Sequence, residues 1–205
     1  MERCVIIGAA PFGDAAALRP LLRGGDFFAV ADGGIRLANA LQITPQLIVS
    51  DCDSAAAPAE QFVHLPVEKD MTDSRAAMDL AFSRGYREFL LLGCLGGRLD
   101  HTIANLLSAR QMTEKGCHVE LADEKHRITV LLPGKYPLTK QKDTQVSLFA
   151  MSERVKGITL HGMKYPLSDY CLLADDPLCV SNEVTAADAT LSFDTGVLLL
   201  IFSKD

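Results

Sequence analysis

The stretch Phe89-Leu90-Leu91-Leu92-Gly93-Cys94-Leu95-Gly96-Gly97-Arg98-Leu99-Asp100-His101 decides the fold of the first half of this chain. It runs from an apolar segment typical of a buried strand, through paired glycines, into the helix-like residues 102–107. Glycines between a strand and a helix leave backbone N–H groups free to bind an anion. An arginine such as Arg98 can bind phosphate with its planar guanidinium, and the neighbouring Asp100 can hold a metal or a hydroxyl proton. The stretch therefore predicts a strand–loop–helix unit that handles phosphate.

The same alternation of strands and helices extends over residues 1–125. Apolar runs predict buried strands at 5–8, 27–31, 47–50, 62–65, 89–92 and 119–122. Amphipathic segments predict helices at 15–22, 35–41, 74–84 and 102–115. This order indicates an N-terminal α/β domain with a mostly parallel sheet flanked by helices.

Residues 126–205 have a different pattern, in which the helical period fades. Strands are expected at 127–132, 146–150, 158–163, 190–193 and 197–202, with prolines and glycines between them. Short strands separated by turn residues favour a second, all-β domain, either an antiparallel sandwich or a barrel.

Composition excludes several classes of protein. Among the 205 residues, the net charge of −6 argues against a nucleic-acid partner, which requires a basic face. No apolar run is long enough to span a membrane, and the N-terminus does not resemble a signal peptide, so we expect a cytoplasmic protein without a membrane partner. The six cysteines form no C-x-x-C pair and are expected to be structural thiols.

Aspartates gather where the predicted strands of the first half end. They are Asp32, Asp51, Asp53, Asp70, Asp73 and Asp100. Ligands of open parallel sheets bind outside the carboxyl ends of the strands, so these carboxylates are expected to share one edge. They would repel one another without a cation, and Mg²⁺ prefers carboxylates together with phosphate oxygens. The pattern favours a metal–phosphate site.

Each element also has a purely structural interpretation. Asp32-Gly33-Gly34 could be a tight turn, and Thr72 could cap an ordinary helix that starts with Asp73. Asp100 could be a helix N-cap, and His101 a packed or surface histidine. Asp51-Cys52-Asp53 could be a solvated turn. Cys52 is dismissed as a nucleophile, because acidic neighbours raise the pKa of a thiol.

Taken in order, these motifs resemble those of the thiamin pyrophosphokinases (thiamin diphosphokinases), of the bacterial type. The matching segments are Asp32-Gly33-Gly34, Asp51-x-Asp53-Ser54, Lys69-Asp70-x-Thr72-Asp73, Gly96-Gly97-Arg98-x-Asp100-His101, Gly162-Met163-Lys164-Tyr165-Pro166-Leu167 and Ser181-Asn182-Glu183. The chain departs from the family pattern at Ser50 and Cys52, where a glycine and a phenylalanine are usual. Both carboxylates are retained there.

The resemblance implies an ATP-binding α/β domain at 1–125 and a thiamin-binding β-sandwich at 126–205. It implies transfer of the pyrophosphoryl group of ATP to the hydroxyl of thiamin, which gives thiamin diphosphate and AMP. It also implies a homodimer, with the thiamin site between the sandwich of one subunit and the α/β domain of the other.

Site roles follow from the same resemblance. Mg²⁺ would be bound by Asp51, Asp53 and Asp70, and catalysis would involve Asp73, Arg98 and Asp100. ATP would contact Asp32, Gly33, Gly34, Ser54, Lys69, Thr72, Gly93, Gly96, Gly97, Arg98 and His101. Thiamin would contact Asp100, Tyr165, Ser181 and Asn182, with the tyrosine ring stacked on the pyrimidine.

Two alternatives remain open at this point. The segment 47–53 resembles the aspartyl-nucleophile loop of haloacid-dehalogenase-type phosphatases, which also need a paired-acid loop. Asp175-Asp176 is such a pair, but it lies in the proline-rich second half, outside the pattern of the parallel sheet. The other alternative is a non-catalytic module that binds nucleotide or thiamin.

Overall fold

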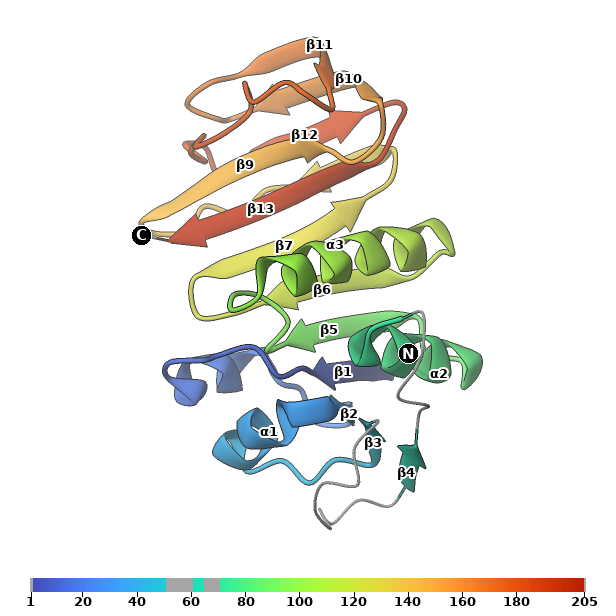
Figure 1. The fold of residues 1–205 in the computed structure, drawn as a ribbon. Helices are drawn as coiled ribbons and strands as arrows, with labels where there is room; N and C mark the ends of the chain where they lie inside the picture. Colours follow the sequence, from blue (N-terminus) through green and yellow to red (C-terminus); the bar gives the residue numbers. More distant parts are fainter. Residues whose placement is uncertain (1, 51–60, 65–70, 205) are drawn as a thin grey trace. The chain divides into compact units, whose positions relative to one another are not determined.

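The computed structural model describes residues 2–50, 61–64 and 71–204, and only the backbone of Asp32 and of 61–64. Contacts divide the chain into two compact units, Met1–Glu124 and Lys125–Asp205 (Figure 1). Each unit is described by itself.

The first unit contains a parallel sheet. Its strands are β1 (Arg3–Ile7), β2 (Phe27–Ala31), β3 (Leu47–Ser50), β4 (Gln61–His64), β5 (Glu88–Leu92) and β6 (His118–Ala122). They are arranged in the order β4-β3-β2-β1-β5-β6. The chain proceeds outward from β1 to β4 and then returns to place β5 on the other side of β1. The strand order therefore reverses between β1 and β5, the kind of position at which such sheets bind ligands.

Helical segments cover both faces of this sheet. They are η1 (Ala15–Leu21), η2 (Asp32–Gly34), α1 (Ile35–Leu41), α2 (Asp73–Ser83) and α3 (Leu99–Glu114). On one face, η1 and α1 share a buried apolar cluster with alternate residues of β1, β2 and β5. Successive strand residues point to opposite faces of the sheet. Helix α2 contacts β1, β2 and β3 but contributes no residue to this cluster, so it packs on the other face of the sheet.

Helix α3 does not bury the residues that its sequence pattern suggests. Leu99, Ile103 and Leu107 are exposed by 72%, 49% and 49%, although they recur every four residues on one face. The buried face carries Asn105, Ser108, Ala109, Met112 and Thr113. This leucine–isoleucine row, here called the α3 stripe, forms an exposed apolar surface on the helix.

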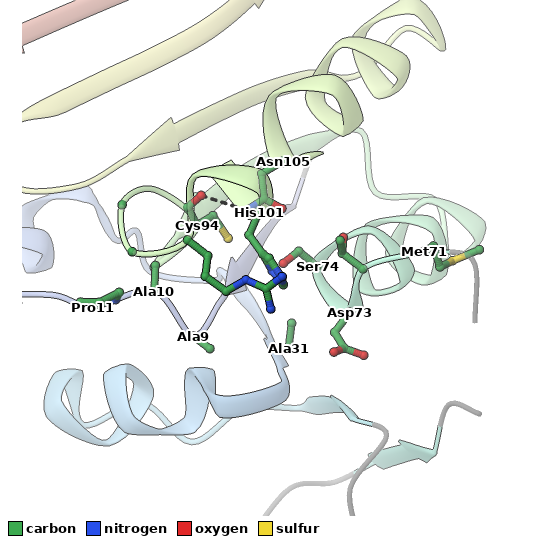
Figure 2. Close-up of a pocket in the computed structure, with 15 residues that line it drawn as sticks. Ala9, Ala10, Pro11, Ala31, Met71, Asp73, Ser74, Cys94, His101 and Asn105 are labelled. Atoms are coloured by element: carbon green, nitrogen blue, oxygen red, sulfur yellow. Dashed lines mark hydrogen bonds between the residues drawn. The ribbon is translucent and has the colours of Figure 1, made fainter. Parts of the chain in front are cut away.

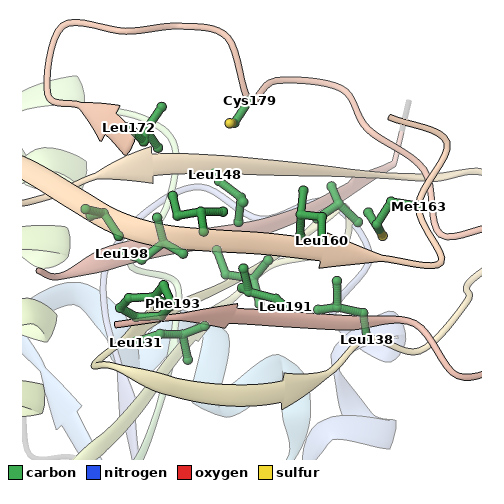
Figure 3. Close-up of a cluster of buried hydrophobic side chains, with 14 of the residues drawn as sticks. Leu131, Leu138, Leu148, Leu160, Met163, Leu172, Cys179, Leu191, Phe193 and Leu198 are labelled. Carbon is green, nitrogen blue, oxygen red and sulfur yellow. The ribbon is translucent and has the colours of Figure 1, made fainter. Parts of the chain in front are cut away.

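The second unit is rich in β-structure. Its strands are β7 (His126–Leu131), β8 (Gly134–Pro137), β9 (Thr144–Ala150), β10 (Arg154–His161), β11 (Leu167–Leu173), β12 (Thr190–Phe193) and β13 (Leu198–Lys204). Antiparallel pairs arrange them as β7-β13-β9 and as β11-β10-β12-β8. Both groups contribute to one apolar cluster, including Leu148 and Leu198 from the first and Leu160 and Leu191 from the second (Figure 3).

The structure confirms most of the predicted elements and corrects a few. Strands β8 and β11 were not expected. Pro137 is tolerated in β8 because that strand lies at a sheet edge, and β11 alternates poorly because it is mostly exposed. The segment expected as a helix at 15–22 is a 3-10 helix that contains Pro20. Helix α3 begins at Leu99 rather than at residue 102, with Arg98 in the N-cap position.

Among the described residues, no helix is both long and apolar enough to cross a membrane. Cys4, Cys94, Cys117, Cys171 and Cys179 are free thiols. Burial raises the pKa of Cys4 and of Cys94 to about 12, so both stay protonated at neutral pH, as expected for structural cysteines.

Candidate active site

A cavity of about 850 Å³ opens at the carboxyl ends of β1 and β5, where the strand order reverses (Figure 2). Its described lining consists of Ala9, Ala10, Pro11, Ala31, Met71, Thr72, Asp73, Ser74, Gly93, Cys94, Gly96, Gly97, Arg98, His101 and Asn105. Seven of these were predicted to bind ATP or to act in catalysis: Thr72, Asp73, Gly93, Gly96, Gly97, Arg98 and His101. The fold thus brings together residues from four separate segments of the sequence, 9–11, Ala31, 71–74 and 93–105.

Two loops that follow β1 and β5 form one wall of the cavity. Gly8 N donates a hydrogen bond to Leu92 O at 2.7 Å, and Ala10 N donates to Gly93 O at 2.8 Å. Gly93 has a φ of +62°, and a Cβ there would lie 2.4 Å from the carbonyl oxygen of Gly8. Only glycine permits both this backbone conformation and this close approach. The two loops are therefore fastened together by their backbones.

Arg98 reaches the cavity from the start of α3. Its Nη2 donates to Asp100 Oδ2 at 2.6 Å, and its Nε donates to Asp100 Oδ1 at 3.2 Å. This hydrogen bond holds the pKa of Asp100 below its usual value and raises that of Arg98. Asp100 is not the N-cap of α3, because the helix begins one residue earlier, with Arg98 in the cap position. The interpretation of Asp100 as a cap is wrong.

The N-terminus of α2 forms the opposite wall. Thr72 Oγ1 accepts a hydrogen bond from Arg75 N at 3.3 Å, which confirms Thr72 as the cap of this helix. Asp73 and Ser74 follow in the first turn and line the cavity (Figure 2). The first-turn N–H groups and the positive end of the helix dipole favour anionic groups at this wall.

A smaller cavity of about 300 Å³ is also lined by residues 9–11. Gly33, predicted to contact ATP, lines it together with exposed Arg36 and Phe12. Gly34 ends η2 and forms the cap of α1. Asp32 is the first residue of η2, and its side chain lies outside the described structure.

Five predicted site residues cannot be placed. Asp51, Asp53, Ser54, Lys69 and Asp70 lie outside the described residues. Within the described part of the chain, no three His, Cys, Asp or Glu side chains form a group that could hold a metal ion. Ala31, which lines the large cavity, pairs in register with Val49 of β3. The end of β3, directly before Asp51, therefore belongs to the same sheet edge as the cavity.

The second unit contains its own cavity, of about 400 Å³, which brings together Tyr165 and Asn182. Its other lining residues are Val146, Leu148, Leu160, Leu167, Leu178, Cys179 and Val180. Tyr165 is 59% exposed, and Nζ of Lys164 lies over its ring, 5.7 Å from the ring centroid. Apolar walls beside an aromatic ring suit a flat heteroaromatic ligand.

The side-chain amide of Asn182 hydrogen-bonds to the backbone of Tyr165 and holds it in place. Its Nδ2 donates to Tyr165 O at 2.7 Å, and its Oδ1 accepts from Tyr165 N at 3.0 Å and from Glu183 N at 2.9 Å. The buried amide thus fixes the loop backbone, whereas the sequence suggested a direct contact with ligand. Ser181 beside it is exposed, and its left-handed φ of +61° is uncommon for a residue other than glycine.

Sequence reasoning missed part of the large cavity. The segment 9–11 was overlooked because alanines and a proline carry no chemical signal of their own. Ser74 and Asn105 were passed over as ordinary helix residues, although both follow predicted motifs by a few positions. The spacing of four residues from His101 to Asn105 would have placed both on one face of a helix.

Comparison with known protein families agrees with this arrangement. The model described as "Thiamin pyrophosphokinase, catalytic domain" matches residues 18–121, and "Thiamin pyrophosphokinase, vitamin B1 binding domain" matches residues 125–198. A thiamine pyrophosphokinase of Bacillus subtilis is 33% identical over 152 residues, which cover 73% of this chain and 70% of the relative.

Solved structures are similar over the whole chain. A crystal structure of thiamine pyrophosphokinase from Bacillus subtilis has a TM-score of 0.89 and 28% identity, and covers 100% of both chains. One of thiamin pyrophosphokinase from Geobacillus thermodenitrificans has a TM-score of 0.85 and 30% identity, and covers 99% of this chain and 98% of that one.

Proposed function

The chain belongs to the thiamin pyrophosphokinase family, and from this premise we infer that it is an enzyme that makes thiamin diphosphate from ATP and thiamin. The hydroxyl oxygen of thiamin forms a bond to the β-phosphorus of ATP. The bond from that phosphorus to the α,β-bridging oxygen breaks, AMP leaves, and the hydroxyl proton is released. The observation that carries this conclusion is the large cavity at the strand reversal, which joins Arg98, Asp73 and the glycine loop.

The phosphatase alternative is not favoured. Its paired-acid loop would have to include Asp176, which belongs to the β-rich unit. There, the carboxylate of Asp176 accepts hydrogen bonds from the hydroxyl of Tyr170 and, at 2.9 Å, from Leu178 N. Those bonds stabilise a local turn.

For the nucleotide, the proposed site is the large cavity. Backbone N–H groups of the loop at Gly96 and Gly97 approach the triphosphate, and Arg98 stabilises the negative charge that develops on it during transfer. Thr72, Gly93 and His101, which also line this cavity, are proposed to contact the nucleotide, as are Asp32, Gly33, Gly34, Ser54 and Lys69. Support comes from the gathering of Thr72, the glycine loop, Arg98 and His101 around this cavity, which the first turn of α2 also lines.

Mg²⁺ is the proposed cofactor, held by Asp51, Asp53 and Asp70. Carboxylate oxygens are suitable ligands, and the end of β3 leads into this edge of the sheet. Asp73 is the carboxylate that lines the cavity among the described residues. Bound Mg²⁺ would neutralise part of the charge of the triphosphate.

The proposed thiamin contacts come mainly from the β-rich unit, which we take to be a sandwich. The pyrimidine ring stacks on Tyr165, and Ser181 supplies a hydrogen bond to it, while Asn182 keeps the tyrosine loop in position. Asp100 orients the hydroxyl of thiamin or accepts its proton.

The proposed assembly is a homodimer with the thiamin site at the subunit interface. Its support is the α3 stripe, because exposed apolar rows of this kind mark interaction surfaces. Light scattering on the Ile103→Lys/Leu107→Lys variant tests it. We expect two chains per particle for the parent protein and one for the variant, with Gln111→Lys on the same helix unchanged. A monomeric parent protein would contradict the assembly.

The activity is tested by incubating the purified protein with ATP, Mg²⁺ and thiamin and by measuring the products. We expect AMP and thiamin diphosphate in equal amounts. Release of inorganic phosphate alone would refute pyrophosphoryl transfer, and binding without AMP would indicate a non-catalytic module.

A further inference from the structure

Asn105 joins helix α3 to the glycine loop from inside the protein. The residue is only 5% exposed, lines the large cavity, and donates from Nδ2 to Cys94 O at 2.9 Å (Figure 2). Cys94 lies at the beginning of the loop that leads to Arg98. This one hydrogen bond therefore positions the loop against the first turns of α3.

The other end of the same amide has no partner. Asn105 Oδ1 is buried and accepts no hydrogen bond from the described residues. Rotating the amide by 180° would set its oxygen against the Cys94 carbonyl, so the carbonyl fixes which end is the donor. A buried acceptor without a donor is unfavourable and rare in folded proteins, and one in a cavity wall points to a ligand that supplies the donor.

Chemistry limits what that ligand group can be. Phosphate oxygens are acceptors, as Oδ1 is, so the triphosphate itself does not satisfy it. ATP carries donors only at its ribose hydroxyls and its adenine amino group. We propose that Asn105 is a nucleotide-positioning residue whose Oδ1 accepts a hydrogen bond from one of these donors. This inference rests on the proposed function, because it takes the large cavity as the ATP site.

Helix α3 offers a matched control. Thr113 Oγ1 is also buried without a partner among the described residues, but Thr113 does not line the cavity. Thr113→Val removes an unpartnered polar atom from the same helix while keeping the shape of the side chain. If losing a buried, unpartnered polar atom from α3 changed ATP affinity through helix packing alone, then Thr113→Val and Asn105→Leu would both show the change.

The experiment is titration calorimetry in the presence of Mg²⁺ and without thiamin. The proteins are the parent chain, Asn105→Leu and Thr113→Val. The nucleotides are ATP, 2′-deoxy-ATP, 3′-deoxy-ATP and inosine triphosphate, whose base lacks the amino group. We expect Asn105→Leu to bind ATP about tenfold more weakly, and Thr113→Val to bind it as the parent does. One analogue should bind the parent about tenfold more weakly than ATP, yet bind Asn105→Leu as well as ATP does.

Three results would overturn the inference: unchanged ATP affinity in Asn105→Leu, an analogue preference that is the same in both proteins, or a parent protein that binds all four nucleotides equally. The third needs no variant, so it applies even where Asn105→Leu does not fold. A parent protein that forms no thiamin diphosphate contradicts the proposed function instead, and the nucleotide titrations would remain interpretable.

Discussion

Arg98 binds the carboxylate of Asp100 through two contacts, Nη2 to Oδ2 at 2.6 Å and Nε to Oδ1 at 3.2 Å. Their side chains are 73% and 65% exposed, and exposed ion pairs contribute little to stability. Arg98 can therefore exchange this partner for a phosphate oxygen at low cost. In the proposed reaction, that exchange would release Asp100 for the hydroxyl of thiamin.

Removing the charge of Asp100 should impair turnover without unfolding the protein. We expect Asp100→Asn to lower kcat by about 10²–10⁴-fold, the usual range for a residue that handles a reacting proton. Glu114→Gln, which alters an exposed ion pair of the same helix, should leave kcat unchanged. Steady-state rates and circular dichroism would check both. Turnover near that of the parent would remove Asp100 from the mechanism.

The pH dependence of activity should not reflect Asp100 above pH 5. The Arg98 hydrogen bond lowers the pKa of Asp100 from 3.8, so the carboxylate loses its charge only in more acidic solution. In Arg98→Met, this pKa should rise toward 3.8. Carboxyl chemical shifts followed by NMR titration measure it directly. An unchanged or lower pKa in the variant would show that Arg98 is not the cause.

A methyl group at Gly93 should be more harmful than one at Gly85, although both residues have a positive φ. Gly85→Ala adds only backbone strain, because its Cβ would meet open space, and should cost about 1–2 kcal/mol. Gly93→Ala adds a clash with the Gly8 carbonyl and should cost about 3 kcal/mol or more. Urea unfolding of both variants measures the difference. Equal losses would contradict the close approach of the two loops.

The buried pair of Arg3 and Asp26 should be the ion pair most sensitive to mutation among those described. Nη2 of Arg3 lies 2.7 Å from Oδ2 of Asp26, and the two side chains are 6% and 2% exposed. Arg3→Met should lower the free energy of unfolding by about 3–5 kcal/mol, because it leaves a buried charge unpaired.

The exposed pair of Lys142 and Asp143 provides the control. Lys142→Met should change the free energy of unfolding by less than about 0.5 kcal/mol. A similarly small loss for Arg3→Met would mean that water reaches the carboxylate of Asp26. Urea midpoints at constant pH distinguish the two results.

The sequence predicted the architecture of the first unit well, because buried parallel strands are continuous apolar runs. It predicted the second unit less completely, since exposed strands such as β11 carry neither an apolar run nor strict alternation. Family motifs named seven of the residues that line the large cavity. They could not indicate that Asn182 holds the loop of Tyr165 in place. That role depends on hydrogen bonds to backbone groups, which are the same for every residue type except proline.

Helix α3 was the least predictable element. Its row of Leu99, Ile103 and Leu107 has the spacing of a core-facing surface, yet the helix buries Asn105 and Thr113 instead. Hydrophobic periodicity identifies a helix, but it does not distinguish a surface that faces the protein's own core from one available to another molecule.

The backbone hydrogen bonds between the segments after β1 and β5 limit how the protein can adapt to its substrates. With Gly8 bonded to Leu92 and Ala10 bonded to Gly93, neither segment can shift without the other. This wall would act as a rigid platform during the catalytic cycle. Any rearrangement that excludes water from the reacting phosphates would have to come from side chains such as Arg98 and from the opposite side of the cavity.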